Sequence, residues 1–163
     1  MPKTAAPTLA ALVAKISSDY PHLELVESSQ FAWHAQTKRL AYKINEKDTT
    51  RNIFSLLHEL GHAVLDHKDY RYDIELLQLE VAAWEKAREL SAHYDIELDE
   101  DYIQDCLDTY RDWLHLRATC PTCYARSLQA SASHYHCFNC QTEWSVTRSR
   151  LCRPYRLKTA QMI

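Results

Sequence analysis

The chain has 163 residues, of which 46% are hydrophobic and 25% are charged, with a formal net charge of −3. This composition lies in the globular range and can support one hydrophobic core with a small appendage. No uncharged apolar run approaches the roughly 18 residues of a membrane span, and the N-terminal TAAPTLAALVA is short and lacks a cleavage site. We therefore expect a soluble, cytoplasmic protein without a signal peptide and without membrane contact.

The first third of the chain predicts one helix and a small sheet. Apolar side chains recur at helical spacing from Leu9 to Tyr20, and Pro21 ends this segment. Three short runs follow, at 22–27, 30–35 and 40–44, and all are rich in aliphatic and aromatic residues. Such runs are typical of strands, so we expect a short sheet behind the first helix.

The rest of the chain is expected to be helical up to a cysteine-rich segment. Residues able to cap a helix precede apolar stretches that we expect to be helical at about 48–66, 73–94 and 99–116. Residues 1–118 contain 13 Lys and Arg against 21 Asp and Glu, a net charge of −8, whereas residues 119–163 contain 6 against 1, a net of +5. We therefore predict an α+β domain at 1–118, a metal-bound ribbon at 119–146 and a basic tail at 147–163.

His58, Glu59 and His62 form an H-E-x-x-H pattern in the helix expected at 48–66. On a helix, the two histidines project from one face and can bind one metal ion, while Glu59 lies at its flank. Zinc bound there lowers the pKa of its water to about 7, and a neighbouring carboxylate can take the proton during attack on a peptide carbonyl. The alternative is a solvated helix without metal, but the apolar neighbours predict a buried helix, where these polar groups need a partner.

A third ligand is missing from this pattern. His67 lies five residues after His62, about 140° round a continuous helix, so we interpret it as a helix-end or surface histidine. Four glutamates on the next helix remain as candidates: Glu75, Glu80, Glu85 and Glu89. Glu80 shares a stripe with apolar residues, where a lone carboxylate is costly unless an ionic partner faces it. Glu80 is therefore predicted as the ligand, and its alternative is a partly exposed glutamate at the edge of the stripe.

The segments RNIFSLLHELGHAVLDH and EVAAW resemble the ImmA/IrrE family of bacterial and phage metallopeptidases. The family's first motif falls on Arg51, Phe54, His58, Glu59, Gly61 and His62. Its second motif falls on Glu80 and Ala83, with Trp84 where asparagine is common. The resemblance covers about residues 50–90 and implies a small zincin-like fold, in which Glu80 supplies the third zinc ligand and a sheet edge can hold substrate.

Two neighbours of the motif carry further expectations. Asp66 resembles the aspartate that orients a zinc-bound imidazole in thermolysin-like sites, and the alternative is an ordinary helix-end aspartate near Lys68. Gly61 is the single glycine of the chain. Because it lacks a Cβ, we expect it to admit a neighbouring element, either the helix of Glu80 or the sheet.

The second group of candidate metal ligands consists of two C-x-x-C motifs with thirteen residues between them. Its members are Cys120, Cys123, Cys137 and Cys140. This spacing is typical of a zinc ribbon, and six cysteines in a chain without an export signal favour metal binding over disulfides. We therefore predict two zinc ions in the protein, one catalytic and one structural. Tyr124 and Gln141 stand where zinc knuckles usually have glycine, which predicts strained or altered knuckles.

A basic segment follows the ribbon, and its cationic residues are Arg148, Arg150, Arg153, Arg156 and Lys158. It can contact nucleic acid, or it can dock on the acidic first domain.

The leading hypothesis is a zinc metalloendopeptidase acting on a protein substrate, with Glu59 as general base; the family resemblance suggests a transcriptional repressor. One alternative is a Spartan/SprT-like protease acting on DNA-bound proteins, whose third ligand would be His67, His93 or His115. Another is a non-catalytic DNA- or protein-binding regulator with structural zinc in each domain. The oligomeric state does not follow from the sequence.

Overall fold

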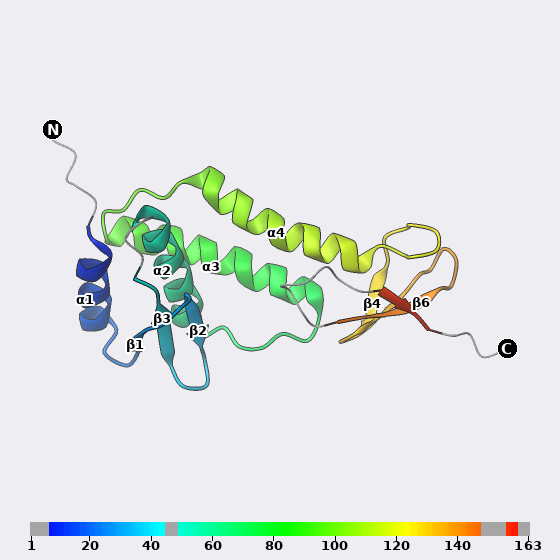
Figure 1. Ribbon diagram of the computed structural model, residues 1–163, viewed down its shortest axis with the longest axis horizontal. Coiled ribbons are helices and arrows are strands. Elements are labelled where there is room, and N and C mark those ends of the chain that lie inside the picture. The colour runs from blue at the N-terminus through cyan, green and yellow to red at the C-terminus, as the bar shows by residue number, and fades with distance from the viewer. Residues whose placement is uncertain (1–6, 45–48, 148–155, 160–163) are drawn as a thin grey trace. The chain divides into compact units, whose positions relative to one another are not determined.

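The computed structural model describes residues 7–44, 49–147 and 156–159, and its ribbon is drawn in Figure 1. The chain divides into two compact units. Unit 1 comprises residues 1–68 and 79–100, and unit 2 comprises residues 69–78 and 101–163. None of the described helices is long and apolar enough to cross a membrane.

Unit 1 has the expected order of one helix, a short sheet and further helices. Its elements are α1 (Leu9–Asp19), β1 (Glu24–Glu27), β2 (Ala32–His34), β3 (Arg39–Tyr42), α2 (Thr49–Val64) and the larger part of α3 (Asp73–His93). The sheet order is β1-β3-β2, with β1 parallel and β2 antiparallel to the central β3. The α+β prediction is thus confirmed, and β2 is an edge strand of this sheet.

The core of unit 1 is built around α2. Leu56, Leu57 and Leu60 of this helix are fully buried, and α2 packs on α1, β2 and β3. The side chain of Thr8 accepts a hydrogen bond from the N–H of Ala11 and so caps α1, whose Ile16 is fully buried. Burial of these aliphatic side chains holds α2 against the sheet and thereby fixes the helix that carries the H-E-x-x-H motif.

Gly61 lies where α2 meets α3. A Cβ built on Gly61 would lie 2.4 Å from the carbonyl oxygen of Ala83, a main-chain atom of α3. This confirms that the glycine admits the helix of Glu80. Positive φ angles are instead adopted by non-glycine residues, which are Lys38, Asp66, Asp95, Tyr124 and Gln141.

Unit 2 contains the first turns of α3, nearly all of α4 (Glu100–Ala118) and a second sheet. This sheet is an antiparallel meander of β4 (Leu128–Ser131), β5 (His134–His136), β6 (Glu143–Val146) and β7 (Arg156–Lys158). The boundary expected between residues 118 and 119 thus lies inside unit 2, and α4 is grouped with the cysteine-rich ribbon. The segment expected as a tail contributes β7, which pairs with β6.

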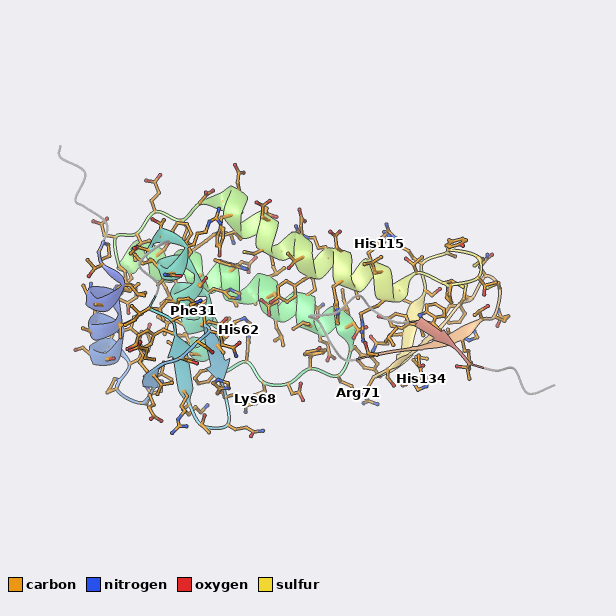
Figure 2. All side chains as sticks on the ribbon, in the orientation of Figure 1. Phe31, His62, Lys68, Arg71, His115 and His134 are labelled. Carbon is orange, nitrogen blue, oxygen red and sulfur yellow. The ribbon has the colours of Figure 1, made fainter. Side chains whose placement is uncertain are left out.

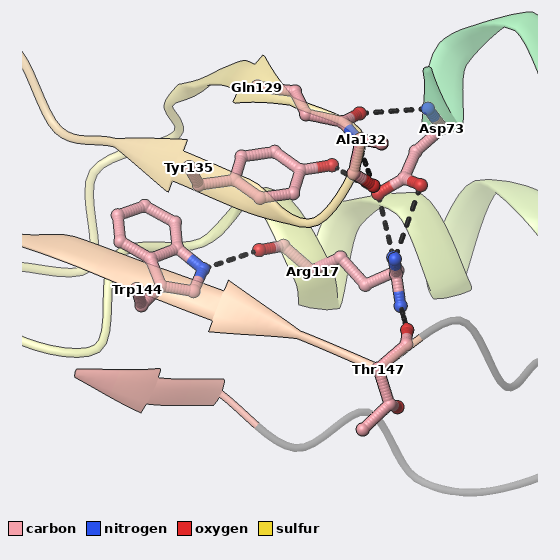
Figure 3. Close-up of polar contacts among 7 residues, drawn as sticks. All are labelled: Asp73, Arg117, Gln129, Ala132, Tyr135, Trp144 and Thr147. Atoms are coloured by element: carbon pink, nitrogen blue, oxygen red, sulfur yellow. Dashed lines mark hydrogen bonds and ion pairs between the residues drawn. The ribbon is translucent and has the colours of Figure 1, made fainter. Parts of the chain in front are cut away.

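A buried ion pair explains why helices and ribbon form one unit (Figure 3). The Arg117 guanidinium of α4 donates to both carboxylate oxygens of Asp73 at the start of α3, at 2.7 and 3.2 Å. Tyr135 of β5 donates its hydroxyl to the same carboxylate at 2.6 Å, and Trp144 of β6 donates its indole N–H to the carbonyl of Arg117 at 2.9 Å. Since both charges are almost completely buried, these additional hydrogen bonds are needed to offset their desolvation.

Candidate metal centres

The first candidate centre joins α2 and α3 within unit 1. The Nε2 atom of His58 lies 3.0 Å from Oε2 of Glu80 and 3.2 Å from Nε2 of His62. The Nε2 atom of His62 lies 3.6 Å from the same carboxylate oxygen. Both histidines come from α2, where Figure 2 labels His62, and Glu80 comes from α3.

This donor set fits a divalent metal ion. The three ligand atoms lie within 4.8 Å of one another, and the side chains of Glu80 and both histidines are almost entirely removed from solvent. Burial raises the pKa of Glu80, but hydrogen bonds to the two histidines outweigh it and hold that pKa well below its usual range. Two imidazoles and one carboxylate are the ligands of many catalytic zinc sites. The group is therefore compatible with zinc.

The other glutamates considered for α3 lie elsewhere. Glu75 accepts hydrogen bonds from the N–H groups of Arg71 and Tyr72 and so caps the start of α3. Glu85 and Glu89 are exposed. The three candidates for the third ligand of a SprT-like site, which are His67, His93 and His115, lie outside the described metal-ligand group.

Glu59 lies beside the histidines and touches the edge of the sheet. Its Oε2 accepts a hydrogen bond from the main-chain N–H of Trp33 in β2 at 2.8 Å. The register pairs Trp33 with Leu40 of β3, and this N–H points to Glu59 rather than to β3. The sequence carried no signal for this contact because a main-chain donor is independent of residue type.

The expectation that Asp66 orients a ligand imidazole is wrong, because Asp66 contacts neither His58 nor His62. Its carboxylate pairs with the ammonium groups of Lys38 and Lys68, and the hydrogen bond to Lys38 lowers the pKa of Asp66. The reason is the turn that ends α2. Asp66 has a φ of 51°, and the partners of its side chain are the two lysines.

That turn brings His67 back to the helix instead. The N–H of His67 donates to the carbonyl of His62, and the N–H of Asp66 donates to that of Ala63, which together form a Schellman motif. The Nδ1 atoms of His67 and His62 consequently lie 2.8 Å apart. Burial lowers the pKa of His67. His67 is outside the ligand group and lies at the end of the helix, as expected, and it is a half-buried neighbour of His62.

The second candidate centre is the four-cysteine ribbon. Its Sγ atoms lie within 4.8 Å of one another, with Cys120 and Cys140 at 3.6 Å and Cys123 and Cys137 at 3.5 Å. Four thiols at such distances are compatible with a closed tetrahedral zinc site. The ribbon also has a small core in which the rings of Tyr135 and Trp144 stack at 5.5 Å.

Both cysteine knuckles adopt the left-handed backbone that glycine usually provides. Tyr124 has a φ of 62° and Gln141 a φ of 61°. Their N–H groups donate to the carbonyls of Cys120 and Cys137, which are the first cysteines of the two pairs. The prediction of strained knuckles is therefore confirmed at both positions.

Three arginines of the basic segment lie outside the described residues, namely Arg148, Arg150 and Arg153. Arg156 and Lys158 belong to β7, opposite Val146 and Trp144 of β6.

A family model described as the IrrE N-terminal-like domain, from a peptidase family, matches residues 20–149. The chain belongs to this family. Searches of curated proteins and of solved structures found no significant match. Membership in the IrrE N-terminal-like family confirms the resemblance drawn from residues 50–90 and extends it over the second candidate centre. It supports an activity of the metallopeptidase type.

Proposed function

We propose that this protein is a zinc metalloendopeptidase that hydrolyses peptide bonds of a protein substrate. The observation that supports it most is the convergence of His58, His62 and Glu80 beside Glu59, in a member of a peptidase family. His58, His62 and Glu80 would hold the catalytic zinc, and the four ribbon cysteines would hold a structural one. A catalytic zinc ion lowers the pKa of water to about 7 and polarises a carbonyl group.

Glu59 is the proposed general base. Glu59 follows the candidate ligand His58 directly in the sequence, and its Oε2 is positioned by the N–H of Trp33. This hydrogen bond leaves the second carboxylate oxygen to accept a proton from water and pass it to the leaving amine. A peptide lying along the edge of β2 would pass close to this carboxylate, which agrees with the substrate edge implied by the family.

His67 is proposed to position His62. With its Nε2 bound to zinc beside Glu80, His62 would carry the ring proton on Nδ1 and could donate it to Nδ1 of a neutral His67. Such partners fix the orientation and tautomer of a ligand imidazole. The main chain of His67 is held in turn by the indole N–H of Trp33, which donates to its carbonyl at 3.0 Å.

The decisive experiment combines metal content with hydrolysis of fluorescein-labelled casein. We expect about two zinc ions per chain in the wild type and in Glu59→Gln, and about one in Glu80→Ala. Glu59→Gln should lower the rate by about 100- to 10,000-fold, because it removes the base and keeps the ligands. Glu85→Ala, an exposed glutamate of the same helix, is the matched control and should retain both metals and activity.

Unchanged zinc content in Glu80→Ala would contradict the ligand assignment, and hydrolysis by Glu59→Gln would contradict the mechanism. A non-catalytic regulator would show two zinc ions and no hydrolysis in any variant. The family resemblance suggests a transcriptional repressor as substrate, whereas the Spartan/SprT-like alternative suggests a DNA-bound protein. A panel of purified repressors would test the first choice.

Nucleic-acid binding by the basic segment is a further proposal. Deletion of the chain after Ser145 is a poor test, because it removes β7 and the carbonyl of Thr147, which accepts a hydrogen bond from Arg117. Replacing Arg148, Arg150 and Arg153 by glutamate reverses the charge of the segment and keeps both β7 and Thr147 in the chain. A salt-dependent gel shift that this variant loses would support binding, and no shift at low salt would refute it.

A further inference from the structure

Unit 2 contains an apolar recess, which the proposed hydrolysis does not use. It is a pocket of about 690 Å³, within the range of ligand-binding pockets. Its apolar walls come from the start of α3, the end of α4 and the ribbon, and they include Ile74, Leu77, Leu114, Ala118 and Leu128.

The rim of this pocket includes two exposed apolar side chains. Leu128 is 69% exposed and Ile74 is 48% exposed, although both are large aliphatic residues. Beneath the rim, Tyr135 and Gln129 line the pocket and are fixed by the hydrogen bonds of the buried network in Figure 3. Exposed apolar side chains around a preformed recess are typical of a surface that binds a partner.

The two charged residues among the described lining residues, Arg111 and Arg126, are both cationic. Together with His115 they line the pocket, and none of the described lining residues is acidic, although α4 itself is rich in aspartate. His115 is labelled on α4 in Figure 2, and it and Arg126 are exposed. Arg111 also contacts Asp108 and Gln104, so Arg126 is the cation from which we expect the largest effect. Electrostatic complementarity therefore favours an occupant that carries carboxylates.

The main chain beside the pocket can receive an extended segment. Leu128 and Gln129 belong to β4, which is an edge strand of the four-stranded sheet in the part of the chain that the structure describes. A peptide that aligns with such an edge presents alternate side chains to the same side. These side chains would enter the apolar recess, and the intervening ones would lie nearer the cationic rim.

We infer that this pocket of unit 2 is a docking site for an extended peptide segment of a partner protein, in which aliphatic side chains alternate with carboxylates. Nucleic acid fits the observations less well, since the walls are mainly aliphatic whereas nucleic-acid interfaces are polar and strongly cationic. Binding at the pocket requires no hydrolysis, so it can be measured in the full chain carrying Glu59→Gln. Failure of docking and failure of the proposed peptidase activity are then separate results.

The probe is a short fluorescein-labelled peptide in which leucine alternates with glutamate, followed by fluorescence anisotropy. Leu128→Ser and Arg126→Glu should each weaken its binding by about tenfold. Phe138→Ser is the matched control for Leu128, because Phe138 is an apolar residue of the same ribbon that is 68% exposed and does not line the pocket. It should leave the affinity unchanged, and equal zinc content would verify the fold of each variant.

Two further probes distinguish the kind of partner. A peptide in which lysine replaces glutamate should bind weakly to the parent chain and more tightly to Arg126→Glu, because the sign of the rim charge is reversed. A single-stranded oligonucleotide whose binding depends on Arg126 and not on Leu128 would identify a polyanion site and overturn the inference. No binding of the leucine–glutamate peptide, or equal binding to all variants, would also overturn it.

Discussion

The imidazoles of His62 and His67 meet through their Nδ1 atoms, 2.8 Å apart, because the turn after α2 folds His67 back over the last helical turn. A histidine five residues after another would lie on a different face of a continuous helix. The left-handed Asp66 changes this direction. The end of α2 therefore determines the surroundings of a candidate metal ligand as well as stopping the helix.

Replacing His67 should weaken zinc binding without removing a ligand. We expect His67→Phe to lower the zinc affinity of the first centre by about 10- to 100-fold, since partners of ligand imidazoles have effects of this size. His67→Asn should restore part of it, because its side-chain oxygen can occupy the place of Nδ1. Competition with a chelating dye measures the affinity, and the cobalt-substituted spectrum reports ligand geometry.

Asp66→Asn is the control for this experiment. Asparagine tolerates the left-handed backbone and removes only the charge that faces Lys38 and Lys68. Zinc affinity should be unchanged. If Asp66→Asn lowered the zinc affinity more than His67→Phe does, Asp66 rather than His67 would be the residue that positions His62.

Gly61→Ala should destabilise unit 1, although alanine is the better helix former by about 1 kcal/mol. The added methyl group would meet a main-chain oxygen of α3, and a backbone atom cannot move aside as the end of a side chain can. We expect a loss of about 1–3 kcal/mol in the free energy of unfolding, together with weaker zinc binding. Denaturant unfolding followed by circular dichroism measures the first quantity, and a gain in stability would show that α3 can shift freely.

Tyr124→Gly should stabilise the ribbon. A left-handed conformation costs an L-residue about 1–2 kcal/mol, and glycine avoids this cost. Part of the stabilisation is offset because glycine loses more conformational entropy on folding. Tyr124 is 74% exposed, so little packing is lost. We expect a higher resistance of the ribbon to chelators, read out as a slower release of one zinc ion to a chelating dye. Tyr124→Ala, which keeps the strain and removes the ring, should not show this gain.

Tyr135→Phe should cost about 1–3 kcal/mol at neutral pH, because the buried Asp73 carboxylate loses one of its donors. Burial and the hydrogen bond to Asp73 raise the pKa of Tyr135 above its usual value. A raised pKa stabilises the folded protein below the unfolded value of about 10, and this contribution is lost as the pH rises further. The stability difference between wild type and variant should therefore shrink above about pH 10. A difference of constant size up to pH 11, or an equal effect of the exposed Tyr124→Phe, would exclude this role.

Local patterns were sufficient to predict most elements and to identify the two groups of candidate metal ligands. The helical spacing of Leu9 to Tyr20, the strand-like runs and the cysteine spacing each match an element of the structure. Glu80 could be singled out because a carboxylate on an apolar stripe needs an ionic partner. Arg117 gives the same signal in α4, where it is buried like Ile103 and Leu107 on that helix, and it could have been recognised in the same way.

The remaining features depend on geometry that residue types do not encode. The turn at Asp66 lacks the glycine that usually marks it, so the position of His67 was not predictable. Asp73 is the first residue of the helix expected at 73–94, and its partner Arg117 lies 44 residues later in the sequence. The contact between Glu59 and Trp33 uses a main-chain N–H, which any residue except proline would supply.

The contact at Gly61 also predicts how this position would respond to a complete set of substitutions. Any side chain begins with the Cβ that would lie 2.4 Å from the Ala83 carbonyl oxygen, so size and polarity should matter little. In a deep mutational scan selected for activity, every replacement at position 61 should score poorly, in the manner of His58 and His62. Such a profile would make the residue look like a ligand, although it offers no atom to the metal.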